Sequence, residues 1–147
     1  MSTVVTDSAW SVSVPHDPKG ARQARRRIDA ELAGMIPPDL LIEVLAVAAE
    51  LIGNAVRHAD PLPGGLIRVA WRLRAEASTE RVEIRVTDGG AAVVPTVRVV
   101  GPDAPDGRGL HIVATLAARW GVERDGLGQT VWAELCHPVT RPLASTP

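Results

Sequence analysis

The chain has 147 residues, of which 46% are hydrophobic and 22% are charged, and its formal net charge at pH 7 is −1. These values are typical of one globular domain, and they exclude a broad charged footprint for nucleic acid or a membrane surface, so neither is expected as a direct partner. Cys136 is the only cysteine, which excludes a disulfide framework or a thiolate metal cluster and favours a reducing, cytoplasmic location.

The start of the chain predicts a strand followed by a helix. Residues 1–7 are expected to form a loose end, and alternating apolar and polar residues predict a strand at Ala9–Val14. Asp17 can cap a helix that has Pro18 at its first position and runs to about Ala33. The arginines of this helix mostly face outward, where they form either a solvated face or a contact for nucleic acid or an acidic partner.

A second helix is predicted from Leu40 to about His58, with Asp39 as its cap. It carries an apolar stripe at helical spacing and ends at a segment rich in proline and glycine. Its polar residues gather on the neighbouring flank, where Glu50 and Asn54 lie one turn apart and Arg57 follows. Alone, this pattern fits either a solvated face or a site.

Two alternating segments, Leu66–Arg74 and Arg81–Val86, predict a hairpin joined by Ala75–Glu80. Asp88-Gly89-Gly90 closes the second strand. Ala91–Asp106 contains three prolines and is expected to be mainly a long loop, which is usually functional or mobile at this length.

The last part of the chain predicts a helix and a second hairpin. Gly107-Arg108-Gly109 opens a helix over Leu110 to about Trp120, with Trp120 facing inward. The hairpin pairs Gly121–Asp125 with Thr130–His137. The order of elements predicts an α+β fold, a two-layer sandwich with a mixed, mostly antiparallel sheet and its helices on one face. Residues 8–137 are expected to form the domain, with 1–7 and 138–147 as flexible tails.

Several common sites are absent from the sequence. It contains no GxxxxGK[ST] phosphate loop, no HExxH and no GxGxxG after a strand, and its four histidines show no metal-ligand spacing. Three weaker features remain, namely the Glu50–Asn54 pair, Asp88-Gly89-Gly90 and the glycine-started helix.

Each of these three features suits one part of a nucleotide. An aspartate at a strand end can accept a hydrogen bond from a flat amine, and glycines beside it allow a close approach. Amide groups at a helix start bind anions. An asparagine oxygen can bind magnesium that bridges phosphates, and a glutamate one turn away can act as a base. Together they predict a site for a nucleoside triphosphate with Mg²⁺.

The segments Glu50–Ala59, Val86–Gly90 and Gly107–Val113 resemble the N box and the two glycine boxes of the superfamily that contains gyrase, heat-shock chaperone, histidine-kinase and mismatch-repair ATPases. The chain is most similar to its small single-domain branch, the anti-sigma-factor serine/threonine kinases common in actinomycetes, and Gly128–Leu135 resembles that branch's closing strand. The likeness spans about residues 9 to 136. It implies the Bergerat-type ATP-binding fold, with ATP and Mg²⁺ as ligands.

The resemblance also implies roles for individual residues. Glu50 matches the catalytic base, Asn54 the magnesium ligand and Asp88 the residue that binds the adenine amino group. The other nucleotide-binding positions that it implies are Arg57, Gly90, Gly107, Arg108, Gly109, Leu110 and Thr130. Ala91–Asp106 corresponds to the lid over the nucleotide.

By the same resemblance, the chain is expected to phosphorylate an anti-anti-sigma protein and to hold a sigma factor, and the resemblance suggests a homodimer. A nucleotide-gated switch without significant phosphotransfer is the alternative. Two departures from the family pattern bear on this choice. Ala92 replaces the last glycine of the Asp-x-Gly-x-Gly box, and Pro105-Asp106 stands where kinases of this branch often carry a basic residue.

Overall fold

The computed structural model describes residues 4–90, 108–126 and 128–138 of the chain. Its elements follow the predicted order of strand, two helices, two strands, helix and two strands. Their bounds are β1 Val4–Pro15, α1 Pro18–Leu32, α2 Pro38–His58, β2 Leu66–Glu76, β3 Thr79–Asp88, α3 Arg108–Leu116, β4 Arg119–Arg124 and β5 Gln129–Pro138. The predicted lid, Ala91–Asp106, and Gly107 lie outside the described residues.

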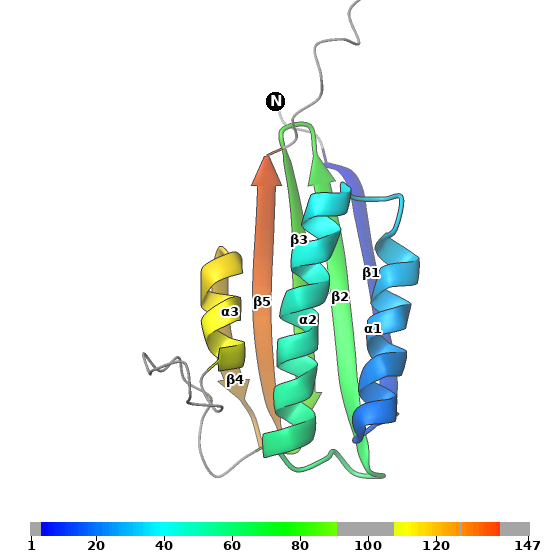
Figure 1. Ribbon diagram of the computed structural model, residues 1–147, viewed down its shortest axis with the longest axis vertical. Helices are drawn as coiled ribbons and strands as arrows, with labels where there is room; N and C mark the ends of the chain where they lie inside the picture. Colours follow the sequence, from blue (N-terminus) through cyan, green and yellow to red (C-terminus); the bar gives the residue numbers. More distant parts are fainter. Residues whose placement is uncertain (1–3, 91–107, 127, 139–147) are drawn as a thin grey trace, which may run out of the picture.

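Among the described residues, the strands form one five-stranded sheet in the order β1-β2-β3-β5-β4, and every neighbouring pair is antiparallel. Helices α1, α2 and α3 cover one face of this sheet (Figure 1). The predicted α+β class and the single helical layer are therefore confirmed, and the sheet is wholly antiparallel rather than mixed. Among the described residues, no helix is both long enough and apolar enough to cross a membrane.

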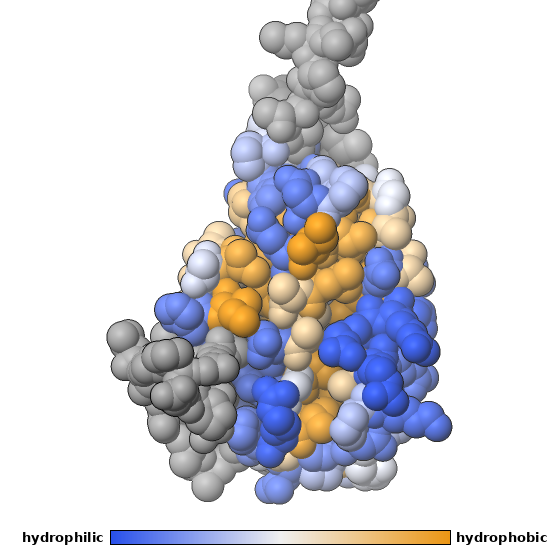
Figure 2. All heavy atoms as spheres, in the orientation of Figure 1, coloured by the Kyte–Doolittle hydropathy of each residue, from blue (hydrophilic) through white to orange (hydrophobic). Residues whose placement is uncertain are grey.

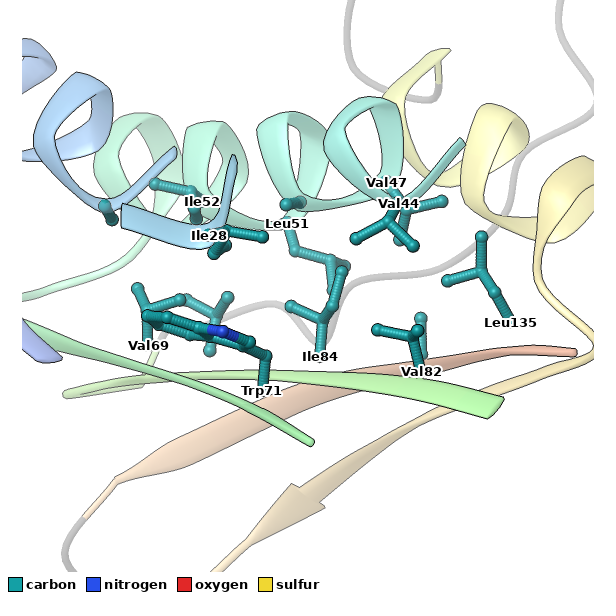
Figure 3. Packing of buried hydrophobic residues seen from close by; sticks show 14 of the residues in the cluster. Ile28, Val44, Val47, Leu51, Ile52, Val69, Trp71, Val82, Ile84 and Leu135 are labelled. Carbon is teal, nitrogen blue, oxygen red and sulfur yellow. The ribbon is translucent and has the colours of Figure 1, made fainter. Parts of the chain in front are cut away.

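The hydrophobic core lies between the sheet and the helices, because alternate residues of each strand point toward the helical layer. Trp71 and Ile84 project from the sheet toward Ile28 of α1 and Leu51 of α2 (Figure 3). All four side chains are at most 2% exposed. The Trp71 ring also stacks on Trp10, with ring centroids 6.2 Å apart. In a chain without Phe or Tyr, tryptophan and branched aliphatic residues fill the core.

Several predicted boundaries were wrong. β1 begins at Val4 rather than Ala9, and β2 and β3 extend into the predicted link, so that their connection is a tight turn. α2 begins at Pro38, and Asp39 lies in its first turn without acting as the cap. α3 ends at Leu116, and Trp120 belongs to β4.

Candidate functional site

The carboxyl-terminal ends of α2 and β3 lie at the same end of the molecule (Figure 1). A pair of backbone hydrogen bonds joins the chain that follows each element: Gly89 N–H donates to the Asp60 carbonyl at 2.7 Å, and Asp60 N–H donates to the Gly90 carbonyl at 2.9 Å. This contact requires glycine at position 89, because a Cβ atom there would overlap the Pro61 carbonyl. Gly90 has a φ of +98°, which also favours glycine.

His16 makes a second connection at this end. Its Nε2 atom lies 2.8 Å from the carbonyl oxygens of both Ala55 and Ala59. Because both acceptors are carbonyls, Nε2 must carry the proton and donate. A donor here satisfies carbonyls that the end of a helix leaves unpaired, and it fixes the last turn of α2 to the start of α1.

Asp88 is the central polar group of this region. Its side chain is 2% exposed and points to the helical face of the sheet, in line with buried Val86 and Ile84. Its Oδ1 atom accepts a 2.7 Å hydrogen bond from Gly90 N–H. Oδ2 has no hydrogen-bond partner among the described residues, and it is not one of their fully enclosed unpaired atoms. Oδ2 therefore retains the capacity to accept a hydrogen bond from a further donor.

Burial raises the pKa of Asp88 above its usual range. The hydrogen bond from Gly90 and the charges of His16 and Arg124 act in the opposite direction but do not cancel this effect. The protein therefore holds an acid at a position where ionisation costs more than it does in water, as is common at functional sites.

An open pocket of about 340 Å³ is lined by the neighbours of Asp88, Gly89 in sequence and Gln129 across the strand pair, but not by Asp88 itself. This volume is near the lower end of the roughly 300–1,000 Å³ that is typical of small-molecule sites. Its described lining is Asp60, Gly89, Gly90, Arg124, Asp125, Gly126, Gly128 and Gln129. The pocket thus joins the loop after α2, the end of β3 and the β4–β5 turn.

Gln129 is a pocket residue that the sequence interpretation missed. It pairs with Asp88 across β3 and β5, is 2% exposed, and accepts a 3.0 Å hydrogen bond from Arg124 Nε at its Oε1 atom. Thr130, the predicted residue, projects from the opposite face of the sheet, where its hydroxyl lies 2.8 Å from that of Thr87. Counting the strand alternation from Asp88 in the observed register identifies Gln129 instead.

The polar flank of α2 lies on the same side of the sheet as Asp88. Arg57 Nη2 donates a 3.2 Å hydrogen bond to Asn54 Oδ1, so the guanidinium engages the oxygen that was predicted to bind magnesium. Glu50 is half-buried and has no ion pair or side-chain hydrogen bond among the described residues. None of these three side chains belongs to the described pocket lining, which lies nearer the end of α2.

The third predicted feature is described only in part. α3 begins at Arg108, which agrees with a helix opening at this segment, and Leu110 is buried at 4% exposed. Gly107 lies outside the described residues. The described residues contain no group of three or more His, Cys, Asp or Glu side chains placed to hold a metal ion. A divalent cation here would therefore need ligands such as the Asn54 oxygen and phosphates.

Asp88→Asn is expected to stabilise the protein without ligand at neutral pH, by about 0.5–2 kcal/mol, because it removes a buried charge and keeps an acceptor for Gly90. Because folding raises the pKa of Asp88, wild-type Asp88 lowers the free energy of unfolding above that pKa, where it is ionised. The advantage of the variant should therefore shrink as the pH falls through the pKa and Asp88 becomes neutral. Urea unfolding at several pH values measures the difference in free energy of unfolding between the variant and wild type. A variant that is less stable than wild type at every pH would contradict this account.

Gly53→Ala tests the position of Arg57. A Cβ atom at residue 53 would lie 2.7 Å from Arg57 Nη1, at the end of a flexible, exposed side chain. The guanidinium should move away, and alanine should stabilise the helix by about 0.5–1 kcal/mol in thermal or urea unfolding. The same substitution in an Arg57→Ala background is the control. A much larger gain in that background would mean that the Arg57–Asn54 contact resists displacement.

Residues 14–135 match the family described as the histidine kinase-like ATPase domain. Comparison with curated proteins gives no match. The matched region runs from the end of β1 to β5, and so includes the whole helical layer and the end of the sheet that carries Asp88. The chain belongs to the histidine kinase-like ATPase domain family.

Proposed function

We propose that this chain is an ATP-binding regulator that acts as a magnesium-dependent serine/threonine kinase on an anti-anti-sigma protein and also holds a sigma factor. The observation that supports it most is the buried Asp88 carboxylate, whose Oδ2 atom has no hydrogen-bond partner among the described residues and whose neighbours Gly89 and Gln129 line a pocket. A carboxylate oxygen accepts a hydrogen bond from an exocyclic amine such as that of adenine. Gln129 lies next to it and can bind further polar atoms of a base.

Asn54 and Glu50 are the residues whose side chains suit phosphoryl transfer. When bound, magnesium with ATP would provide the transferable phosphoryl group and neutralise its charge. Asn54 offers a neutral oxygen as a metal ligand once Arg57 releases it. Glu50 has no partner among the described residues, so its carboxylate can take the proton from a serine or threonine hydroxyl. These roles, and a homodimeric state, are part of the proposal.

A nucleotide-gated switch without significant phosphotransfer is the second candidate. The bond from Arg57 to Asn54 favours it, because a cation already occupies the predicted metal ligand. In such a switch, the nucleotide would change affinity for a protein partner and remain intact. Ala92 and Pro105-Asp106 are consistent with this reading, since both depart from the pattern of active kinases.

Binding of Mg-ATP is tested with a matched pair at the start of β5. Gln129→Ala removes a side chain that lines the pocket and should weaken binding about three- to tenfold, the usual effect of one lost hydrogen bond. Thr130→Val changes the adjacent residue on the opposite face and should leave the affinity unchanged. Isothermal titration calorimetry measures both. Equal affinities of wild type and Gln129→Ala for Mg-ATP would mean that the adenine ring does not contact Gln129. If wild type releases no heat, the proposal of nucleotide binding is wrong.

Phosphotransfer is tested with Glu50→Gln, which keeps the shape of the side chain and removes the base. With γ-thio-ATP, Mg²⁺ and an extract of the native host, wild type should label a serine or threonine of a protein substrate, and the variant should label it about 10²–10⁴-fold more slowly. Glu43→Gln, on the same helix, is the control. If both variants transfer as wild type does, Glu50 is not the base, and binding without transfer by wild type favours the switch.

A further inference from the structure

The solvent side of α2 is unusually apolar. Ile42 is 69% exposed, and Leu45, Ala46 and Ala49 follow it at helical spacing with partly exposed side chains. At about 100° per residue, Ile42, Ala46 and Ala49 face away from buried Val44, whereas Leu45 lies at the edge and packs partly against the core. The charged residues of the helix lie to the other flank. A helix that is apolar on its outer side as well as its inner side is usually covered. We refer to Ile42, Leu45, Ala46 and Ala49 as the outer strip.

A basic surface borders the outer strip. The neighbouring helix α1 carries five basic and two acidic side chains. Arg27 pairs with Glu31, whereas Arg22, Arg25 and Arg26 have no ion pair among the described residues. Figure 2 shows apolar surface over α2 beside strongly hydrophilic surface over α1. A ligand that contacts both the outer strip and the basic surface of α1 needs a row of apolar side chains with acidic side chains beside it.

We propose that the outer strip binds an acidic amphipathic helix of a protein partner, with the apolar side of that helix on α2 and its acidic side toward the arginines of α1. The strip follows a helix axis, which suits a helical ligand with apolar residues at positions i, i+3 and i+4. Charge complementarity disfavours a second copy of this chain packed with its α2 antiparallel, because that symmetric contact would bring two basic α1 helices together.

This proposal goes beyond nucleotide binding and can fail separately from it. Ile42 precedes Glu50 by eight residues, which is about 12 Å along a helix. A change at Ile42 should therefore leave Mg-ATP affinity unaltered. Because Ile42 is mostly exposed, a polar replacement there does not disturb the core.

The first experiment identifies what lies on the strip. The photocrosslinking residue p-benzoylphenylalanine replaces either Ile42 or, as the control, exposed Ser11 on β1. Each protein is irradiated in native-host extract, and the crosslinked peptide is mapped by mass spectrometry. The proposal requires an acidic, amphipathic helical segment of another protein that is captured at position 42 and not at 11. Capture of a second copy of this chain or of its residues 139–147, or no capture specific to position 42, overturns it.

The second experiment tests the two chemical features. The mapped segment is made as a labelled peptide, and its binding is measured by fluorescence anisotropy to wild type, Ile42→Glu and Arg25→Glu. Both variants should bind at least about tenfold more weakly, and a peptide with lysine in place of its acidic residues should regain affinity for Arg25→Glu. Unchanged thermal stability and Mg-ATP affinity show that the variants are folded. Equal peptide affinity for wild type and either variant overturns the proposal.

Discussion

The backbone pairing of Asp60 with Gly89 and Gly90 is the contact on which the candidate site depends. It ties the chain that leaves α2 to the chain that leaves β3, so that the helix bearing Asn54 and the strand bearing Asp88 end together. The pairing is possible because residue 89 has no side chain to meet the Pro61 carbonyl. Residues far apart in the sequence thus acquire a fixed geometry from two hydrogen bonds and one glycine, with His16 adding a third link to the last turn of α2.

These contacts fix the backbone next to Asp88 and so hold its ionisable side chain in a buried position. Desolvation raises its pKa, and within the part of the chain that the structure describes only one of its oxygens accepts a hydrogen bond, from Gly90. An apolar or amide residue would suit the fold of the isolated domain better. A buried acid that lowers stability and has one free acceptor is understandable if a ligand supplies the missing donor. Family membership, established over residues 14–135, is consistent with a nucleotide in that role.

Local patterns in the sequence predicted the order of elements and the helical layer, because periodicity and turn chemistry act over a few residues. The grouping of Glu50, Asn54 and Asp88 in one site stays a prediction. The features that the sequence did not predict depend on contacts at long range. The role of Gln129 follows from the β3–β5 register, and the His16 contacts span 39 and 43 residues. The position of Trp120 is compatible with a helical period from Val113 and also with strand alternation with Val122. It lies in a strand because β4 pairs with β5 in the sheet. Asp39 failed as a cap because Pro38 already suits the first position of the helix.

The side chains of α2 face three different environments, and this distribution determines which surfaces a movement of the helix would affect together. One side fills the core, the polar flank carries Glu50 and Asn54, and the outer strip faces solvent. α2 has 21 residues, and the contacts of Asp60 and His16 hold its end; if it shifted as a rigid body, a displacement of its polar flank would also displace the outer strip. Energetic coupling between the two would require two discrete arrangements of α2. The Arg57–Asn54 hydrogen bond is the contact that a bound metal would have to break, and so it is where two such arrangements would first differ.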